Sequence, residues 1–365
     1  MKILFANNAR VCSGCEDHLV DVALWLRDNG VEPVFLVRAG GMLGDVLTGH
    51  GIRVHPVFIQ EKKVALPLRI ARVIRQEQPD VISINREHNI FPVSLGASLA
   101  APFLQKRPKM VAVFHTPTGR WYPGLKGFDG IIATSEYTAA SFYKANPGIE
   151  RLTTVIHYGI RLSAADPAAK EDRARPRRYF QDRGFPIIGM VGELWKNQEE
   201  LVEAATLMLR TFPELTVAFI GGYDPSPPLL AKIEATGHAD RFVLTGRVPR
   251  EQIPDVFFDL DLSVSTHRNE GFGIVHIESL AGHTPVVAYN SGGLVEIIRE
   301  GGGVLVEGGP EQFATAVVDL LADDGKRFAL GREGRRSVVE QFSIDAMGRK
   351  HLAFYRQVLA GSRGR

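Results

Sequence analysis

Cysteine is scarce in this chain of 365 residues, which contains two, and long hydrophobic runs are missing altogether. Two cysteines cannot build the disulfide framework of a small secreted protein, so the reducing cytosol is favoured. No apolar run approaches the roughly 18 residues that a membrane-spanning helix needs. The opening MKILFANNAR lacks the long apolar stretch of a signal peptide and is typical of a first β-strand. The chain is long enough to form two globular domains.

The formal net charge of +2 conceals a difference between the two halves of the chain. Residues 1–165 contain 19 Lys and Arg against 13 Asp and Glu, whereas residues 166–365 contain 24 against 28. A basic N-terminal half favours an anionic partner, such as a phospholipid surface or an acidic acceptor. The alternative interpretation is that the difference between the two halves is ordinary scatter of surface charge. No feature indicates a nucleic-acid partner.

Short apolar runs alternate with helical patterns along most of the chain. Runs rich in Val and Ile predict strands, and several are bounded by Gly, Pro or Asp. The expected strands are KILFA, VEPVFLV, IRVHPVFI, DVISIN, MVAVFH, GIIATS and TTVIHY, followed by PIIGMVG, LTVAFIGG, FVLTG, LSVST, PVVAY and GVLV. This alternation predicts an α/β fold with mostly parallel sheets that helices cover on both faces.

The alternation stops between Arg161 and Pro186, where the sequence is polar, charged and proline-bearing. We interpret this segment as the linker between an N-terminal Rossmann-like domain, residues 1–165, and a C-terminal one, residues 166–345. Residues 346–365 are predicted to form a helix that packs back toward the N-terminal domain. Two such units create a cleft between the carboxyl ends of their sheets, where ligands bind.

The stretch Ser265–Ile298 concentrates the candidate chemistry. Its two carboxylates, Glu270 and Glu278, are separated by seven residues. EGFG is a tight glycine turn before the predicted helix IVHIESLAG, whose first amides and dipole favour a phosphate. Glu278, about two turns into that helix, could accept hydrogen bonds from two vicinal ribose hydroxyls. Gly292 and Gly293 then open a second predicted helix.

EGFGIVHIE followed by PVVAYNSGGLVEII resembles the Glu-x7-Glu signature of GT4-type retaining glycosyltransferases, the glycosyltransferase group 1 family. The segments SGCEDHLVDVALWLRDNG, VAVFHT, IIATSEYTAASF, TTVIHYGI and VGELWKNQEELVEAA extend the resemblance over nearly the whole chain. It implies the GT-B fold, in which two Rossmann-like domains face each other across a cleft. It also implies metal-independent transfer, with retention of configuration, from a nucleotide diphosphate sugar to a glycan, lipid-linked or small-molecule acceptor. No cofactor is expected.

The resemblance implies roles for individual residues of the C-terminal, donor-binding domain. Glu278 would bind the donor ribose. Glu270, with the amides of Phe272, Gly273 and Ile274, would hold the donor sugar and the diphosphate. Breaking a sugar–diphosphate bond builds negative charge on the departing oxygen, which amides and a cation stabilise in place of a metal.

Three further roles involve the N-terminal, acceptor-binding domain and the donor-phosphate segment. His115 would hydrogen-bond the transferred sugar, which becomes oxocarbenium-like, although a histidine at a strand end can also be purely structural. Lys196 would neutralise the diphosphate leaving group. Gly14 would let the N-terminal loop approach the donor. Glu270 likewise has an alternative to its donor-binding role, because it could be an ordinary solvated carboxylate in a loop.

The donor-phosphate segment departs from the family's pattern, which reads Gly-Arg-Leu, a few residues, then Lys. Here the segment is GELWK, with Glu193 at the position of the arginine. A carboxylate beside a diphosphate is unfavourable unless it is paired or points away. Either Lys196 works alone or another cation fills the gap, and the candidates are Arg10, Arg247 and Arg268. Val248 beside Arg247 completes the expected donor-binding set.

The Cys-x-x-Cys pair, Cys12 and Cys15, allows three interpretations. A dithiol at a helix start is typical of thioredoxin-like redox sites, and His18 is the nearest further ligand for zinc. No second cysteine pair exists to complete a zinc site. We prefer a loop of the nucleotide-sugar cleft in which Gly14 is the working residue.

Two other patterns carry a functional and a plain interpretation. Asp259-Leu-Asp261 matches a metal-binding Asp-x-Asp pattern, but it also suits a surface turn before the strand LSVST. In EKKVALPLRIARVIRQEQ the arginines and the apolar residues fall on opposite helix faces: Arg69, Arg72 and Arg75 against Ile70, Val73 and Ile74. This helix is either an ordinary surface helix or a basic patch that touches anionic lipid. In the second case the protein would be cytoplasmic and would bind peripherally to the inner face of the membrane.

Two alternative functions stay compatible with the sequence. A nucleotide-sugar epimerase of the same fold would consume donor without any acceptor. A catalytically silent nucleotide-sugar-binding protein would bind donor and turn nothing over, and Glu193 is its main support.

Overall fold

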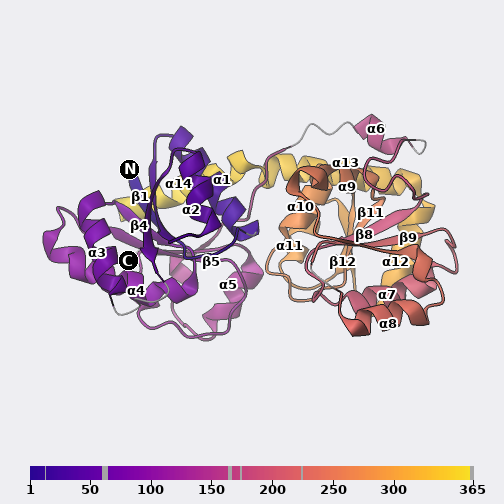
Figure 1. Ribbon diagram of the computed structural model, residues 1–365, viewed down its shortest axis with the longest axis horizontal. Coiled ribbons are helices and arrows are strands. Elements are labelled where there is room, and N and C mark those ends of the chain that lie inside the picture. Colours follow the sequence, from indigo (N-terminus) through magenta and orange to yellow (C-terminus); the bar gives the residue numbers. More distant parts are fainter. Residues whose placement is uncertain (13, 60–64, 163–166, 173–174, 223–224, 362–365) are drawn as a thin grey trace. The chain divides into compact units, whose positions relative to one another are not determined.

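The computed structural model describes residues 1–12, 14–59, 65–162, 167–172, 175–222 and 225–361 (Figure 1). They form two compact units. The first unit combines Met1–Gly159 with Ile344–Arg365, and the second is Ile160–Ser343. Each unit is one parallel sheet with helices on its faces, so the expected architecture of two Rossmann-like domains is confirmed.

The described residues of the first unit form a seven-stranded parallel sheet in the order β3-β2-β1-β4-β5-β6-β7. Its strands are β1 Lys2–Ala6, β2 Glu32–Arg38, β3 Arg53–Phe58, β4 Val81–Ile84, β5 Lys109–Phe114, β6 Gly130–Ala133 and β7 Thr153–Val155. Its helices are α1 Gly14–Asp28, α2 Met42–Gly49, α3 Leu66–Glu77, α4 Ile90–Ala100, α5 Glu136–Tyr143 and α14 Ile344–Ala360.

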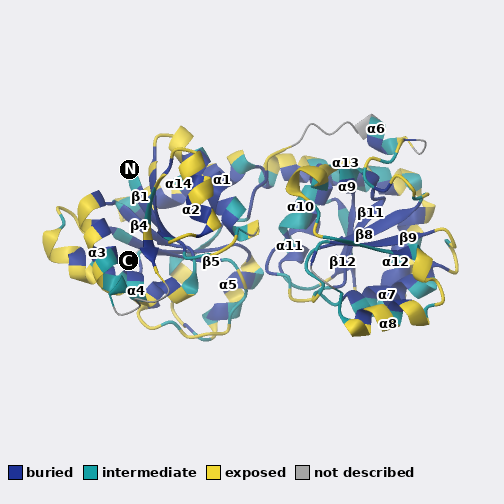
Figure 2. Ribbon diagram, viewed as in Figure 1, coloured by how far each residue is buried: buried dark blue, intermediate teal, exposed yellow. Residues whose placement is uncertain are grey.

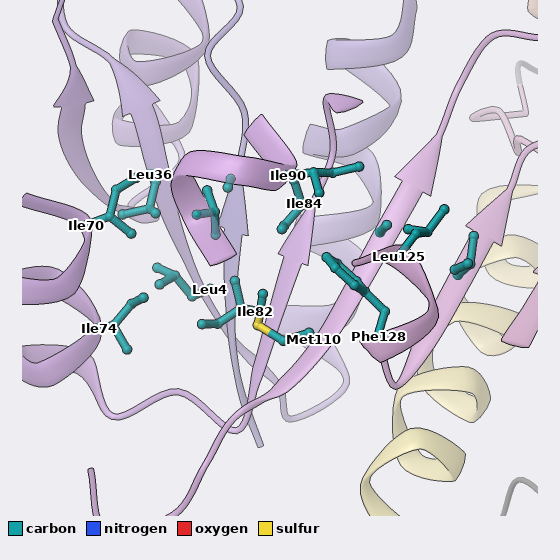
Figure 3. Close-up of a cluster of buried hydrophobic side chains, with 14 of the residues drawn as sticks. Leu4, Leu36, Ile70, Ile74, Ile82, Ile84, Ile90, Met110, Leu125 and Phe128 are labelled. Atoms are coloured by element: carbon teal, nitrogen blue, oxygen red, sulfur yellow. The ribbon is translucent and has the colours of Figure 1, made fainter. Parts of the chain in front are cut away.

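The apolar strands of the first unit serve two cores, one on each face of the sheet. Because successive side chains of a strand point to opposite faces, Leu4 joins the core beneath α3 and α4, while Ile3 and Phe5 join the core beneath α1 and α14. Figure 3 shows Leu4 and Ile82 meeting Ile70 and other side chains in the first of these cores. A strand that is buried on both faces reads as a continuous apolar run, as β1 does.

The C-terminal helix α14 packs against α1. The indole Nε1 of Trp25 donates to Asp345 Oδ1 at 2.7 Å, and a Cβ on Gly348 would lie 2.1 Å from the Trp25 ring. Glycine at position 348 therefore lets the helix approach the tryptophan closely. Further along α14, the Tyr355 hydroxyl and Ser83 Oγ of β4 are 3.0 Å apart and both residues are buried.

The described residues of the second unit form a six-stranded parallel sheet in the order β10-β9-β8-β11-β12-β13. Its strands are β8 Ile187–Val191, β9 Thr216–Ile220, β10 Phe242–Gly246, β11 Leu262–Ser265, β12 Val286–Tyr289 and β13 Gly303–Val306. Its helices are α6 Pro167–Glu171, α7 Gln198–Met208, α8 Pro227–Ala235, α9 Ile253–Asp259, α10 Ile274–Ala281, α11 Leu294–Ile298, α12 Pro310–Ala322 and α13 Asp324–Gln341.

The segment expected to be a linker is partly built into the second unit. Lys170 of α6 is buried, and its ammonium donates to the main-chain carbonyls of Phe257 and Phe258, each at 2.7 Å, at the end of α9. Residues 163–166 and 173–174 of the expected linker lie outside the described residues. Figure 2 shows the buried strands of each sheet between partly exposed helices. Within the described ranges, no helix is both long and apolar enough to cross a bilayer.

Candidate functional site

The order of strands in the second unit defines a switch point between β8 and β11. The chain runs outward from β8 through β9 to β10, and then returns to β11 on the other side of β8. The loops that follow β8 and β11 therefore leave the sheet at the same edge and diverge. Ligands of doubly wound sheets bind in the crevice that such loops leave at the carboxyl ends of the strands.

Lys196 and Glu270 meet at this switch point. Lys196 lies in the loop after β8 and Glu270 in the loop after β11, and Lys196 Nζ donates to Glu270 Oε2 at 2.5 Å. The two side chains are 18% and 16% exposed, so water screens the pair only weakly. The structure thus brings together two residues that are 74 positions apart in the sequence and that were both expected in the site.

The electrostatic surroundings keep Glu270 ionised. Burial alone would raise the pKa of the Glu270 carboxyl, but the Lys196 ammonium, with smaller effects of His276 and His267, lowers it below the ordinary value. Burial lowers the pKa of His276 to about 4, so this histidine of α10 is neutral at physiological pH. Lys196 and Glu270 therefore form a pair of opposite charges that are held close together in the site.

The glycine turn before α10 places the first amides of that helix beside Glu270. Gly273 has φ +99°, and a Cβ there would lie 2.8 Å from Leu294 Cδ1 and 2.9 Å from His276 Cδ2. Only glycine adopts this conformation without strain in so little space. Phe272 is buried against Phe342 and fixes the turn, and α10 begins at Ile274. The first amides of a helix have no partner within the helix and favour an anion.

A second glycine turn, after β12, is bonded to the first. The amide of Gly293 donates to the Glu270 carbonyl at 2.7 Å, and Ser291 Oγ donates to the Arg268 carbonyl at 2.9 Å. A Cβ on Gly293 would lie 2.1 Å from the Gly271 carbonyl oxygen. The two loops therefore hold one another at main-chain contact distance, which fixes the Glu270 backbone.

Glu278 lies on α10, and its side chain is half-buried. The helix begins at Ile274, so Glu278 is just over one turn from its start, and the expected position of about two turns was wrong. The predicted helix also began at Ile274, so the error lay in the count of turns: the four residues from Ile274 to Glu278 make only about one turn.

Glu193 remains without a salt bridge within the described residues, and its main-chain carbonyl accepts from Gln198 Nε2 at 2.7 Å. The candidate replacement cations are placed as follows. Arg268 stacks on the Tyr289 ring at 3.6 Å and donates to Glu200 at 2.8 Å. Arg247 is exposed after β10, two strands from β8, beside the half-buried Val248. Arg10 is exposed in the first unit.

In the first unit His115 directly follows β5, at the carboxyl edge of the sheet. Its Nδ1 is 2.7 Å from the hydroxyl of Tyr158, which follows β7. Burial, and then the Arg86 guanidinium, lower the pKa of His115 to about 4. His115 is therefore a neutral hydrogen-bonding group at physiological pH. Gly14 is exposed at the first position of α1.

The geometry around Cys12 disfavours the redox interpretation. Both cysteines are free thiols, and burial, followed by Asp17 and Glu16, raises the pKa of Cys12 to about 11. A reactive dithiol needs a lowered thiol pKa. His18, the only near candidate for a further zinc ligand, packs edge-on against the Tyr158 ring. Across the described parts of the chain, no group of three or more His, Cys, Asp or Glu side chains could hold a metal ion.

The Asp-x-Asp pattern is neither a surface turn nor an open metal site. Asp259 and Asp261 are both buried. Asp259 accepts hydrogen bonds from the amides of Tyr179 and Phe180 at 2.7 and 2.8 Å, and Asp261 pairs with Arg175 at 3.0 Å. The expectation of a surface turn was wrong, because these carboxylates satisfy buried amides of the segment that precedes β8.

Replacing Asp259 by asparagine lowers the free energy of unfolding by about 3 kcal/mol, since buried amides lose a charged acceptor. Chemical denaturation measures this change. The exposed Asp240, which pairs with Arg241 at 3.3 Å, provides the control, and Asp240→Asn leaves stability unchanged within about 0.5 kcal/mol. Stabilisation of the unsubstituted protein by Mg²⁺ or Mn²⁺ that Asp259→Asn abolishes would contradict this structural role.

Sequence reasoning missed a polar group at the switch point of the first unit, between β1 and β4. Glu16 is buried at the start of α1, and its Oε1 accepts from Arg86 Nη2 at 2.5 Å and from Asn7 Nδ2 at 3.2 Å. Tyr158 was missed too. Both Arg86 and Tyr158 follow strands closely at the carboxyl edge, and this position was the signal available in the sequence.

The comparison with family models matches both units. The model for glycosyl transferases group 1 covers residues 172–337, and the model for glycosyltransferase family 4 covers residues 12–164. Two solved structures share the fold over the whole chain. A glycosyltransferase from Rickettsia africae has a TM-score of 0.80 at 22% identity, covering 99% of each chain. Anabaena HepE in complex with UDP and glucose has a TM-score of 0.75 at 21% identity, covering 97% of this chain and 98% of that one.

Three curated relatives resemble the chain in sequence. A 2-deoxystreptamine glucosyltransferase from Streptomyces kanamyceticus is 27% identical over 253 residues, and a D-inositol 3-phosphate glycosyltransferase from Thermobispora bispora is 34% identical over 230. These matches span 68% and 60% of this chain, but only 65% and 52% of the relatives' own lengths.

The third relative is a GDP-mannose-dependent alpha-(1-6)-phosphatidylinositol monomannoside mannosyltransferase from Mycolicibacterium smegmatis. It is 28% identical over 333 residues, which make up 82% of each protein. The two family models, one on each Rossmann-like unit, agree with the Glu-x7-Glu spacing and with the shared fold. The chain therefore belongs to the GT4-type glycosyltransferases, glycosyl transferases group 1, of the GT-B fold.

Proposed function

We propose that this protein transfers a sugar from a nucleotide diphosphate donor to a glycan, lipid-linked or small-molecule acceptor, with retention of anomeric configuration and without a metal ion. The observation that carries the proposal is the Lys196–Glu270 pair at the switch point, beside the first amides of α10. A cation and helix amides at one place suit a diphosphate. The complex of HepE with UDP and glucose supports a nucleotide donor.

In this proposal the donor changes the partners of the pair. A diphosphate beside α10 attracts the Lys196 ammonium, which turns from Glu270 to a phosphate oxygen and stabilises the charge that develops as the sugar departs. Glu270 is then released to accept hydrogen bonds from hydroxyls of the transferred sugar, and Glu278 accepts from the ribose. The neutral His115 hydrogen-bonds the transferred sugar. The fixed backbone of the two glycine turns holds the amides in place.

Product analysis by NMR tests this function. The protein is incubated with UDP- and GDP-linked sugars and with glycan, inositol and lipid-linked acceptors, and the anomeric coupling of the product is compared with that of the donor. We expect transfer with retained configuration and equal rates with and without EDTA. An inverted product contradicts retention, and loss of activity in EDTA contradicts the metal-independent mechanism. Consumption of donor without acceptor favours an epimerase.

The unpaired Glu193 favours a second candidate, a catalytically silent protein that binds nucleotide sugars. A carboxylate near the diphosphate weakens the stabilisation of the leaving group. Such a protein shows a thermal shift with nucleotide sugars, because any ligand that prefers the folded state stabilises it. It would transfer sugar from none of the donors. If the missing arginine alone causes this lack of activity, the variant Glu193→Arg would transfer sugar.

We propose further that the protein works in the cytoplasm and contacts anionic membrane through α3 and α4. Arg72 and Arg75 of α3 are exposed and Arg69 is half-buried, while the apolar residues of the opposite face are buried, as the helical pattern predicts. Helix α4 is packed beside α3. The M. smegmatis relative, whose name specifies a phosphatidylinositol mannoside, supports a lipid-linked acceptor.

Helix α4 presents an apolar stripe next to these arginines. Phe91, Leu95 and Leu99 of α4 and Phe103 of the 3-10 turn Ala101–Phe103 that follows it recur at intervals of four residues, and they are 75%, 39%, 42% and 58% exposed. The Arg75 guanidinium lies 4.0 Å above the Phe103 ring and so connects α3 to the turn that follows α4. Large apolar side chains aligned in this way mark an interaction surface.

The charge around the stripe favours a phospholipid surface over a protein partner. In residues 66–78 and 90–107 the only carboxylate is Glu77, which is buried and paired with Arg53 at 2.8 Å. Exposed Lys106 and Arg107 add to the arginines of α3. Apolar side chains with cations, and no exposed acid within residues 66–78 and 90–107, match the interface of an anionic bilayer.

The double variant Phe91→Ser/Leu95→Ser is expected to weaken binding to vesicles containing phosphatidylglycerol by at least about tenfold, since two apolar anchors are lost. Flotation at low salt measures the binding. Leu230→Ser, on the exposed side of α8 in the second unit, is the control and leaves binding unchanged. Equal binding of both variants contradicts the proposal. A monomer–dimer equilibrium that only the double variant abolishes would assign the stripe to a second copy instead.

A further inference from the structure

Trp195 is an exposed aromatic side chain in the donor-phosphate segment. It lies in the loop between β8 and α7, directly before Lys196, and it is 70% exposed. Tryptophan is large and mostly apolar, and folded proteins bury most of its surface on average. Where a tryptophan does stand at a binding surface, it is among the residues that contribute most to affinity. Its exposure beside the Lys196–Glu270 pair therefore indicates a contact with a ligand.

The residues on both sides of Trp195 are anchored in the second unit. Leu194 packs against the apolar core beneath α7 and α12. Gly222, after β9, leaves room for it, since a Cβ there would lie 2.7 Å from Leu194 Cγ. On the other side, Lys196 is held by Glu270. Trp195 is thus exposed between two neighbours whose side chains are fixed.

The main chain of this loop is held as well. The carbonyl of Glu193 accepts from the buried Gln198 Nε2 at 2.7 Å and from the Lys196 amide at 3.3 Å. The carbonyl of Asn197 accepts from Oγ1 of Thr266, which follows β11, at 2.7 Å. The loop after β8 is therefore bonded to the chain after β11. A surface that is already ordered loses little conformational freedom when a ligand binds to it.

The side chains around the indole combine an aromatic ring with charged groups. The ring of His267, in the loop after β11, lies perpendicular to Trp195 with the ring centroids 5.4 Å apart. The Lys196 ammonium, which donates to Glu270, lies 5.9 Å from the centre of the Trp195 ring. One ammonium group thus has an aromatic ring and a carboxylate as neighbours.

A pyranose ring matches this combination of groups. Its hydroxyls, at the edge of the ring, form hydrogen bonds with charged side chains, whereas its C–H groups give it an apolar face that packs on an aromatic ring. A diphosphate needs only the cation and the helix amides, and it gains nothing from an indole. In the proposed function Lys196 binds the diphosphate that carries the sugar, which brings the sugar within reach of Trp195.

We propose that Trp195 is the platform on which the ring of the transferred sugar stacks, while Glu270 accepts hydrogen bonds from hydroxyls at the edge of that ring. The inference rests on the proposed function, because it assigns the donor sugar to the same site. It makes Trp195 a residue that selects the donor by its sugar and not by its nucleotide.

Titration calorimetry with paired ligands tests the platform and needs no turnover. The pairs are UDP with UDP-glucose and GDP with GDP-mannose, and the pair that binds to the unsubstituted protein is used. Trp195→Ala should weaken the binding of the nucleotide sugar by about tenfold and change that of the nucleotide alone by less than about twofold. Trp195→Phe keeps an aromatic ring and should recover most of the affinity for the nucleotide sugar.

Trp121→Ala is the matched control. Trp121 is 68% exposed in the first unit, between β5 and β6, so its loss removes a surface tryptophan without touching the donor site. Both affinities should stay unchanged in this variant. Because Trp195 is exposed too, chemical denaturation should find Trp195→Ala as stable as the control.

Four results would overturn the inference. Unchanged affinity for the nucleotide sugar in Trp195→Ala excludes the platform. Equal weakening of both ligands of the pair places the indole on the nucleotide instead, and a raised KM for the acceptor with normal donor affinity places it on the acceptor. If the unsubstituted protein binds no nucleotide sugar, the proposed function fails and the inference fails with it, whereas the other three results leave the proposed function intact.

Discussion

Replacing Lys196 by alanine lowers the rate of sugar transfer by more than about tenfold, a loss of at least about 1.4 kcal/mol of barrier stabilisation. Negative charge develops on the departing diphosphate, and Lys196 is the cation that the structure places at the switch point beside α10. The weak solvent exposure of this ammonium makes its interaction with that charge strong. In this chain Glu193 occupies the position at which the family has an arginine. Lys196 therefore has to stabilise a larger share of the negative charge on the diphosphate than it would beside that arginine.

The measurement is kcat with saturating donor and acceptor. Lys232, a half-buried lysine of α8 that pairs with Glu203 in the second unit, supplies the control, and Lys232→Ala keeps the full rate. The double variant Lys196→Ala/Glu270→Gln separates two causes, since it removes the cation without leaving a carboxylate unpaired. It should remain as slow as the single variant. Recovery of the rate in the double variant would show that the lysine only neutralises Glu270.

The variant Gly293→Ala should abolish detectable donor binding and lower the free energy of unfolding by about 2 kcal/mol or more. A Cβ at this position would lie 2.1 Å from the Gly271 carbonyl oxygen and 2.8 Å from the Gly271 carbonyl carbon. Both contacts are with main chain, which no side-chain rotation can relieve. The two glycine turns must therefore separate, which breaks the bond from the Gly293 amide to the Glu270 carbonyl and displaces the first amides of α10.

Gly309→Ala is the control for this steric argument. Gly309 precedes α12 in the same unit, has φ −124°, and its added Cβ would have no neighbour within 4 Å. Titration calorimetry with a nucleoside diphosphate, together with chemical denaturation, should find this variant unchanged. Normal nucleotide affinity in Gly293→Ala would mean that the turns do not hold the donor.

Most of the fold follows from local sequence. Each expected strand occurs, because runs rich in Val and Ile that are buried on both faces form the centre of a parallel sheet. The run IRVHPVFI contains Pro56, which cannot donate to a sheet ladder, and its strand β3 lies at the edge of the sheet as this requires. The burial of Ile70, Val73 and Ile74 on α3 also follows from the helical period.

The geometry of the site depends on contacts that local sequence does not encode. Lys196 and Glu270 meet only because β11 lies beside β8, and strand order is a property of the whole sheet. The contact of Tyr158 with His115, 43 residues apart, likewise depends on the order of β5, β6 and β7. The resemblance to GT4-type enzymes supplied the site residues, but not these contacts.

A second error in reading a motif, besides the position of Glu278 on α10, concerns Asp259 and Asp261. Two carboxylates beside a strand suggested a surface turn or a metal site, since unpaired acids are rarely buried. They are buried here because the residues before β8 bring Arg175 and several main-chain amides to them. The amide of Tyr179, which donates to Asp259, is 80 residues away in the sequence, so the Asp-x-Asp motif alone could not predict it.

A crystal structure of this protein with a nucleotide diphosphate sugar bound tests the central claim most directly. The account predicts a diphosphate beside the amides of Gly273 and Ile274, Lys196 Nζ within hydrogen-bond distance of a phosphate oxygen, and Glu278 on the ribose hydroxyls. A diphosphate seated elsewhere on the second unit, with the Lys196–Glu270 pair intact and Glu278 turned to solvent, would contradict it.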